Sequence, residues 1–258
     1  MNISTNLFRA SALAIALAGA SAPAFAAPVK NIVLVHGAWV DGSGWKPVYD
    51  ILVRDGYSVS VVQQPLTSLE ADVTATKRVL DMQNGPTILV AHSYGGSIIT
   101  EAGVHPNVVG LVYVAAHAPD VGENEAALGK DKPSYTSQQK GAIKRTPDNY
   151  LYLDPAVFHT DFAADLPREQ AEFEAHSQIP TSADVFSTSM TVAAWKTKPS
   201  WGIVAGADRI INPDLERFYY KRAGSRTTEI EGASHSVYES RPRDVAAVIE
   251  DAARNAQP

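Results

Sequence analysis

The stretch PTILVAHSYGGSII, residues 86–99, decides the fold. Residues 87–91 are apolar and mostly β-branched, which is typical of a strand buried on both faces. The two glycines and the apolar residues after Tyr94 predict the start of a buried helix. Between strand and helix, Ser93 stands in a small-x-Ser-x-Gly turn that runs from Ala91 to Gly95. A serine at such a sharp corner is held in strained backbone with its hydroxyl exposed at the sheet edge, so Ser93 is the predicted nucleophile.

The neighbours of Ser93 suit this role. The small residues at positions 91 and 95 let the incoming strand and the outgoing helix pass each other closely. The helix directs its N–H groups and the positive end of its dipole at the serine, where negative charge would develop. Similar turns also occur in ordinary loops, and Ala91 stands where the commoner pattern has glycine. The motif therefore needs support from the rest of the chain.

The first 26 residues are predicted to form an export signal. Arg9 supplies the positive charge of the n-region, residues 12–20 are apolar, and residues 24–26 (Ala-Phe-Ala) form an A-x-A cleavage site. The apolar run is too short to span a membrane. We therefore expect cleavage near Ala26 and a periplasmic or secreted mature protein.

The composition argues against several classes of function. The chain of 258 residues has a formal net charge of −6 and contains no cysteine. A mildly acidic chain without a basic stripe has no affinity for phosphate backbones, and we expect neither nucleic acid nor a membrane as partner. The lack of cysteine excludes disulfides, thiol chemistry and cysteine-bound zinc. The histidines show no metal-ligand spacing with acids, so no metal is expected.

Strands and helices alternate along most of the chain. Strands are predicted at residues 31–35, 57–62, 87–91, 108–115, 201–205 and 227–231. Helices are predicted at residues 44–53, 213–222 and 242–253, and another begins at a capping box formed by Thr67 and Glu70. This alternation, with strands that are apolar on both sides, predicts an α/β fold in which helices cover both faces of a parallel sheet.

The alternation breaks between residues 118 and 199. This segment is richer in charge, proline and polar residues, and it shows no strong strand signal, whereas residues 168–177 and 182–195 have helical patterns. About 80 residues without strands inside an α/β chain are better interpreted as an inserted helical cap than as a loop. The predicted domains are therefore a signal peptide (1–26), a core (27–117 and 200–258) and a cap (118–199).

Two candidate partners of Ser93 follow strands of the predicted sheet. Asp208 comes shortly after the strand at 201–205, and His235 comes shortly after the strand at 227–231. Ligands bind at the carboxyl ends of the strands in open parallel sheets, so we expect both side chains near Ser93. The histidine would take the proton of the serine, and the carboxylate would fix the tautomer of the histidine.

Two other residues compete with this assignment. Asp120 is a rival for the acid of the triad, because it also follows a core strand. His92 stands next to the nucleophile, but its side chain should point away from the pocket. We therefore interpret His92 as a packing residue.

Four motifs in this order resemble the α/β-hydrolase superfamily: His36-Gly37-Ala38, the turn around Ser93, Gly206-Ala207-Asp208 and Ala233-Ser234-His235. Within it, the chain resembles the small serine esterases of the plant methylesterase and hydroxynitrile lyase group and related bacterial carboxylesterases. The resemblance covers nearly all of the mature chain. It implies the α/β-hydrolase fold, with a mainly parallel sheet of about six strands, a helical cap after the 108–115 strand and no cofactor.

The resemblance also implies an oxyanion hole formed by the backbone N–H groups of Ala38 and Tyr94. Their positions agree with this, since Tyr94 follows the nucleophile and Ala38 lies in the loop after the first core strand. Trp39, which follows the oxyanion residue, and the cap residues Phe158 and Phe162 are predicted to line the substrate pocket. A substrate carboxylate is expected to reduce activity, because no arginine pair is evident near the nucleophile.

The predicted function is hydrolysis of small to medium, apolar or aromatic carboxylic esters through an acyl-enzyme. A hydroxynitrile lyase is a weaker alternative, because the related plant lyases carry threonine where this chain has Gly37 and lysine where it has Ser236. A perhydrolase would use peroxide in place of water on the same acyl-enzyme. From a different class, a ligand-binding receptor with vestigial activity can share the fold, but the complete triad favours an enzyme.

Overall fold

The computed structural model describes Met1 and residues 29–256, so apart from Met1 the predicted signal peptide lies outside the described residues. Six strands form one sheet in the order β2-β1-β3-β4-β8-β9, and every neighbouring pair is parallel. The strands are β1 (Asn31–Val35), β2 (Ser58–Val62), β3 (Thr87–Ser93), β4 (Val108–Ala116), β8 (Ser200–Ala205) and β9 (Arg226–Ile230). The predicted α/β fold and its number of strands are confirmed.

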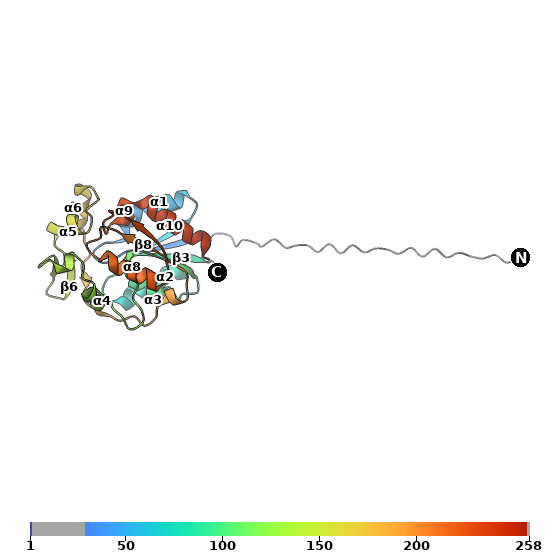
Figure 1. Cartoon of the computed structure of the whole chain (residues 1–258), viewed down its shortest axis with the longest axis horizontal. Helices are drawn as coiled ribbons and strands as arrows, with labels where there is room; N and C mark the ends of the chain where they lie inside the picture. Colours follow the sequence, from blue (N-terminus) through green and yellow to red (C-terminus); the bar gives the residue numbers. More distant parts are fainter. Residues whose placement is uncertain (2–28, 257–258) are drawn as a thin grey trace.

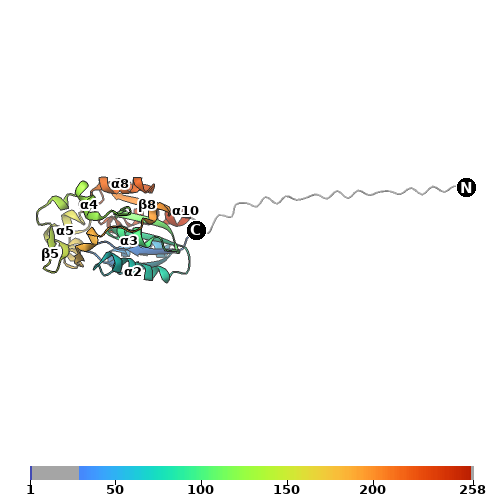
Figure 2. The ribbon, with the colours of Figure 1, turned by 90° about the horizontal axis from the view of Figure 1, so that it is seen from below.

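Helices cover both faces of this sheet (Figure 1). One face is covered by α1 (Lys46–Arg54), α9 (Val237–Ser240) and α10 (Pro242–Asn255). The opposite face is covered by α2 (Leu69–Asp81), α3 (Gly95–Ala102) and α8 (Pro213–Arg222). Of these, α2 and α3 lie side by side, and α8 covers another part of the sheet (Figure 2). The nucleophile strand β3 lies in the interior of the sheet, where every residue of the strand is buried.

Alternation along the strands divides the core into two clusters. Successive side chains of a strand point to opposite faces of the sheet. Ile32 and Leu34 of β1 belong to the same cluster as Ile249 of α10, whereas Val33 and Val35 belong to the same cluster as the residues of α2 and α3. Both faces are therefore apolar, which explains why these strands appear in the sequence as continuous apolar runs.

The start of α2 differs by one residue from the predicted capping box. Ser68, not Thr67, is the N-cap, and its Oγ accepts a hydrogen bond from the N–H of Ala71 at 3.1 Å. Two adjacent hydroxyl residues can both fill this role, so the sequence pattern does not decide between them.

The segment between β4 and β8 is not purely helical. It lies at one end of the sheet and carries the helices α4 (Glu125–Asp131), α5 (Pro155–Asp161), α6 (Arg168–His176) and α7 (Asp184–Ser187). It also contains an antiparallel sheet of β5 (Ile143–Arg145), β6 (Tyr150–Leu153) and β7 (Thr181–Ser182). The prediction of a helical cap is wrong in this respect, because strands of two to four residues are too short to show an alternating pattern.

The helical pattern predicted for residues 182–195 is also only partly present. It is divided into the short helix α7 and the 3-10 helix η3 (Ala194–Lys196), and Ser182 belongs to β7.

Hydrogen bonds join the cap to the loop after β1. The N–H of Ile179 donates to the carbonyl oxygen of Trp39 at 3.1 Å, and the N–H of Trp39 donates to Thr181 Oγ1 at 3.2 Å. Trp39 has a positive φ of 68°, a conformation that non-glycine residues rarely adopt. The cap therefore holds the loop of the predicted oxyanion residue Ala38 in an unusual backbone conformation.

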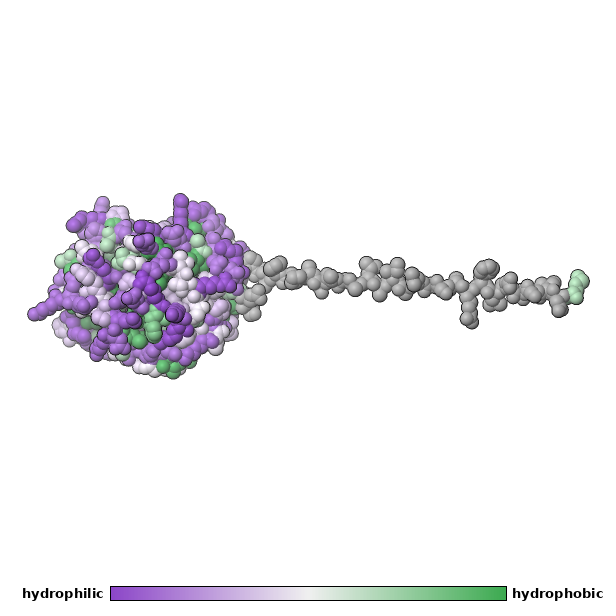
Figure 3. Space-filling view, in the orientation of Figure 1, coloured by the Kyte–Doolittle hydropathy of each residue, from purple (hydrophilic) through white to green (hydrophobic). Residues whose placement is uncertain are grey.

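The face of the molecule seen in Figure 3 is mostly hydrophilic, and its apolar residues form small, separate groups. Among the described residues, none of the helices combines the length and the apolar character that crossing a bilayer requires.

Candidate active site

Ser93 lies at the corner between β3 and α3, where the sequence predicts it. Its φ is +55°, the strained conformation expected of a nucleophile elbow. Two glycines make this corner possible. A Cβ at position 96 would lie 1.9 Å from the carbonyl oxygen of His117, and a Cβ at position 37 would lie 2.6 Å from the Cβ of Ser93. The corner thus leaves no room for a side chain at either position.

Asp208 and His235 are joined directly, as the sequence predicts. The Nδ1 of His235 lies 2.6 Å from the Oδ2 of Asp208, and both side chains are buried. The other oxygen of Asp208 accepts hydrogen bonds from the N–H groups of Ile210 and Ile211 at 2.7 and 2.9 Å. Because a carboxylate accepts, Nδ1 carries the proton and Nε2 keeps its lone pair. Nε2 has no hydrogen-bond partner among the described residues.

His92 connects the nucleophile strand to the loop of His235. Its Nε2 lies 2.9 Å from the carbonyl oxygen of His235, and the centroids of the two imidazole rings lie 4.5 Å apart. A carbonyl can only accept, so Nε2 of His92 carries the proton. Burial holds the pKa of His92 well below its ordinary value, and its ring is neutral at pH 7. His92 therefore packs as predicted and also positions the backbone of His235.

No hydrogen bond joins Ser93 Oγ to His235 Nε2 in this structure, and within residues 29–256 neither atom has another hydrogen-bond partner. The contact between a nucleophile and its base is often long before the substrate binds. Ser93 and His235 thus lie on segments that the His92 hydrogen bond joins, and Oγ of Ser93 and Nε2 of His235 are both free to react.

A second buried carboxyl group lies near Asp208. Glu216 of α8 is fully buried, and its Oε2 accepts a hydrogen bond from the N–H of Ala205 at 3.0 Å. Burial, followed by the nearby charge of Asp208, raises the pKa of Glu216 well above its ordinary value. Burial therefore favours the protonated form of Glu216, while the carboxylate that faces His235 is that of Asp208. The sequence gives no sign of this neighbour, because Glu216 lies outside the motifs.

The rival acid Asp120 is engaged elsewhere. Its Oδ1 lies 2.5 Å from the Nζ of Lys196 and accepts a hydrogen bond from the N–H of Val121. No described hydrogen bond links Asp120 to His235. The geometry therefore favours Asp208 as the acid.

The N–H groups of Ala38 and Tyr94 donate no hydrogen bond within the described part of the chain. Ala38 lines the cavity around Ser93, whereas the phenol of Tyr94 points elsewhere and donates to Asp72 Oδ2 at 2.8 Å. Both N–H groups thus remain able to bind an oxyanion.

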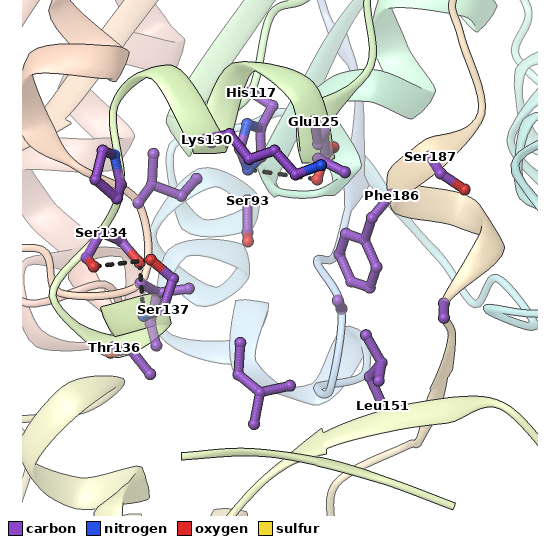
Figure 4. A pocket seen from close by; sticks show the side chains of 18 of the residues that line it. Ser93, His117, Glu125, Lys130, Ser134, Thr136, Ser137, Leu151, Phe186 and Ser187 are labelled. Carbon is purple, nitrogen blue, oxygen red and sulfur yellow. Dashed lines mark hydrogen bonds and ion pairs between the residues drawn. The ribbon is translucent and has the colours of Figure 1, made fainter. Parts of the chain in front are cut away.

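A cavity of about 790 Å³ contains Ser93. Figure 4 shows the hydroxyl of Ser93 pointing into it, with Leu151 and Phe186 on one side and Ser134 and Ser137 on the other. Trp39 also lines the cavity, as predicted. The aliphatic side chains that complete the lining are those of Ile143, Ile210, Ile211 and Leu215.

The prediction that Phe158 and Phe162 line the pocket is wrong. Both side chains are fully buried, and neither reaches the cavity. The ring of Phe162 meets the ring of His235 edge-on at 4.7 Å, and Phe158 stacks on Phe162 at 4.8 Å. The two rings fill the space beside His235 between the cap and the core. Full burial there removes more of their apolar surface from water than a position in the lining of an open cavity would.

A polar cluster that the sequence analysis missed lies beside Ser93. Nε2 of His117 lies 3.4 Å from Oε2 of Glu125, and the hydroxyl of Ser97 donates to Oε1 of Glu125 at 2.5 Å. Burial lowers the pKa of His117 to about 3 and raises the pKa of Glu125 to about 8, so both groups are neutral near pH 7. Glu125 belongs to α4 and Ser97 to α3, so the cluster also joins the cap to the core.

The sequence gives only part of the information needed to predict this cluster. His117 follows the carboxyl end of β4, as Asp208 follows β8, but Glu125 lies in the cap with no motif around it. The cluster is not a metal centre: among residues 29–256, no three His, Asp or Glu side chains are grouped so that they could hold a metal ion.

We expect Glu125→Gln to change how the stability of the protein depends on pH. A carboxyl whose pKa is raised on folding destabilises the folded state progressively as pH rises from its unfolded value, near 4.5, to its folded value, about 8. The amide has no proton to lose in this range. From pH 5 to pH 8 the wild type should therefore lose about 3 kcal/mol of unfolding free energy more than the variant.

Denaturant unfolding of both proteins at several pH values measures this difference. Glu169→Gln, which alters an exposed glutamate of α6, is the matched control and should follow the wild type. Parallel profiles for Glu125→Gln and the wild type would contradict the assignment of a neutral Glu125.

Comparisons with known proteins agree with this architecture. A carbendazim hydrolyzing esterase of Nocardioides sp. (strain SG-4G) is 34% identical over 39% of this chain, and the match spans about half (47%) of that protein. Norfluorocurarine synthase 2 of Strychnos sp is 24% identical, and the match covers 84% of this chain and 92% of that protein.

Solved structures with the same fold include a pyrethroid hydrolase from Sphingobium faniae JZ-2, with a TM-score of 0.73, 24% identity and coverage of 88% of this chain and 98% of the other. Polyneuridine aldehyde esterase has a TM-score of 0.73 and 17% identity, and the match covers 86% of this chain and 98% of the other. The methylesterase MES16 from Arabidopsis has a TM-score of 0.69, 18% identity and coverage of 85% and 96%.

The resemblance to the plant methylesterase group extends to the fold, which polyneuridine aldehyde esterase and the methylesterase MES16 share with this chain. Residues 32–248, which include Ser93, Asp208 and His235, match the sequence model of the alpha/beta hydrolase family. This match covers most of the chain, from the second residue of β1 into α10. The chain therefore belongs to the alpha/beta hydrolase family.

Proposed function

We propose that the protein is a serine carboxylesterase that hydrolyses small to medium carboxylic esters through an acyl-enzyme. The observation that carries this proposal is the 2.6 Å bond between Asp208 and His235, which leaves the lone pair of Nε2 unoccupied near the Ser93 elbow. Similarity to a carbendazim hydrolyzing esterase supports the same class of reaction.

In this mechanism, Oγ of Ser93 attacks the ester carbonyl while Nε2 of His235 takes its proton. Asp208 stabilises the imidazolium that forms, and the N–H groups of Ala38 and Tyr94 bind the oxyanion. His235 then gives the proton to the departing alcohol, which leaves the acyl group on Ser93. A water molecule, deprotonated by His235, attacks this acyl-enzyme. The bond between the acyl group and Oγ of Ser93 then breaks, His235 returns the proton to Oγ, and the acid is released.

The test is rapid mixing of the protein with p-nitrophenyl butyrate. An esterase with slow deacylation releases about one equivalent of p-nitrophenol in a burst and then turns over steadily. A ligand-binding receptor would bind the ester without releasing p-nitrophenol, and this outcome would contradict the proposal.

The lyase alternative receives no support from the site. A side chain at position 37, where the related plant lyases carry threonine, would bring its Cβ within 2.6 Å of the Cβ of Ser93. Gly37 instead leaves the nucleophile room at the elbow.

Leu151 and Phe186 form an apolar wall of the cavity, and we expect this apolar wall to select the acyl or alcohol group of the ester. Each methylene buried there contributes about 0.8 kcal/mol, or roughly fourfold in kcat/KM, until the cavity is full. Leu151→Ala and Phe186→Ala should each lower the ratio of kcat/KM for p-nitrophenyl hexanoate to that for the acetate by about tenfold.

Phe158→Ala is the matched control for the apolar wall. This variant should lower the free energy of unfolding by about 3–5 kcal/mol, since Phe158 is fully buried, but it should leave the ratio between the two esters unaltered. A ratio that changes with Phe158→Ala and not with the two wall variants would mean that substrate selection lies elsewhere.

Export is a separate part of the proposal and rests on residues 1–26. Protein isolated from its native host should begin at Ala27 and lie outside the cytoplasm. N-terminal sequencing that finds Met1 or Asn2 on the folded protein would contradict export.

A further inference from the structure

Three basic side chains line the cavity that contains Ser93. They are Lys130 at the end of α4, Lys132 directly after it, and Arg145 in β5. Figure 4 shows Lys130 extending across the cavity on the same side as His117 and Glu125. This concentration of positive charge is unexpected, because the chain as a whole carries a net charge of −6.

Within residues 29–256, none of these three side chains forms an ion pair with a carboxylate. Other basic residues of the same region do: Lys144 lies 3.0 Å from Asp154, and Lys196 lies 2.5 Å from Asp120. The guanidinium of Arg145 donates only to the neutral amide of Asn149, which also lines the cavity.

The acids of the cavity do not cancel this charge. Burial keeps Glu125 protonated near pH 7, with its pKa at about 8. Asp184 is the remaining carboxylate of the lining, so three cations are opposed by one charged acid. The carboxylate of Asp208 does not line the cavity and is already bound to His235.

The helix dipole explains only part of this grouping of positive charges. A lysine in the last turn of a helix is favoured by the helix dipole, which accounts for Lys130. Arg145 comes from a strand of the cap sheet and has no helix end to stabilise. Cations from two separate elements of the cap therefore line one cavity together with Leu151 and Phe186, and Arg145 lies directly across from Leu151 in the β5–β6 pair.

We propose that the preferred substrates of this site are amphiphilic esters that carry a carboxylate, which binds among Lys130, Lys132 and Arg145 while the apolar part of the ester lies against Leu151 and Phe186. This inference rests on the proposed esterase function. It reverses the sequence-based expectation that a carboxylate reduces activity, because the cations that receive it lie in the cap and not near the nucleophile in sequence.

The test compares esters that differ only in charge. On the acyl side, the half-ester mono-p-nitrophenyl adipate is paired with its neutral carboxamide analogue, p-nitrophenyl adipamate. On the alcohol side, the hexanoate ester of 4-hydroxybenzoate is paired with that of 4-hydroxybenzamide. Partly exposed ion pairs each contribute about 1.4-fold to 5-fold, so three cations predict a preference of roughly tenfold in kcat/KM for the acid in one of the two pairs.

The charges are then removed with the triple variant Lys130→Gln, Lys132→Gln, Arg145→Gln. The ratio of acid to amide should fall to about one, and 0.3 M NaCl should lower the preference of the wild type. Lys140→Gln is the matched control, since Lys140 is an exposed lysine of the cap that does not line the cavity. This control should keep the wild-type ratio.

The outcomes separate the two proposals. Hydrolysis of the amide analogues with equal or slower hydrolysis of both acids would overturn the charge preference and leave the esterase intact. A preference that survives in the triple variant, or that Lys140→Gln abolishes equally, would also overturn it. Failure to hydrolyse any of the four esters would instead contradict the esterase itself.

Discussion

Ser93→Ala is expected to lower kcat by about 10⁶-fold, because the nucleophile of a Ser-His-Asp set has no substitute. Oγ of Ser93 makes no hydrogen bond to another described residue, so its loss leaves no buried polar group without a partner. The thermal midpoint should therefore remain close to that of the wild type. The residual rate reflects substrate binding and the N–H groups of Ala38 and Tyr94 alone.

Two measurements check this result. Steady-state hydrolysis of p-nitrophenyl butyrate gives the loss of kcat, and differential scanning calorimetry gives the thermal midpoint. A fluorophosphonate should label the wild type once, on the peptide that contains Ser93, and should leave the variant unlabelled. Labelling on another peptide, or turnover that survives the substitution, would remove Ser93 from the role of nucleophile.

The second large effect is expected from Asp208→Asn, with a loss of about 10⁴-fold in kcat. The position of Asp208 explains why the amide fails. One oxygen already accepts from the N–H groups of Ile210 and Ile211, so the amide oxygen must stay there and the NH₂ group must face His235. An NH₂ group donates to Nδ1, which moves the imidazole proton to Nε2 and removes the base.

Asp120→Asn is the matched control for this substitution. Asp120 pairs with Lys196 and has no described contact with His235, so the change should alter kcat by less than about threefold. Measuring kcat of both variants with the same ester decides the question. If Asp120→Asn abolishes turnover and Asp208→Asn does not, the acid of the triad is Asp120.

The core could be predicted from the sequence because its signals are local. Continuous apolar runs identify the strands β1, β3, β4 and β8. A polar residue at the end of a strand or shortly after it identifies Ser93 and Asp208 as site candidates. The rule that ligands bind at the carboxyl ends of parallel strands then brings these residues together without any knowledge of contacts.

The cavity could not be predicted, because its walls depend on contacts between distant segments. Phe158 and Leu151 are both apolar residues of the cap, and nothing in the sequence shows that one packs behind His235 while the other faces Ser93. In the same way, Glu125 meets Ser97 across 28 residues, and Arg145 reaches the cavity from a three-residue strand that has no sequence pattern.

In evolutionary terms, the absence of space at positions 37 and 96 separates residues that can change by neutral substitution from residues that cannot. A new side chain at either position must displace Ser93 or His117, so selection for any reaction at this serine acts against it, whatever the substrate. Wall residues such as Leu151 and Phe186 can exchange one apolar side chain for another without moving the elbow. Descendants of this chain can therefore acquire new substrate ranges through the cap while they inherit an unaltered reaction centre.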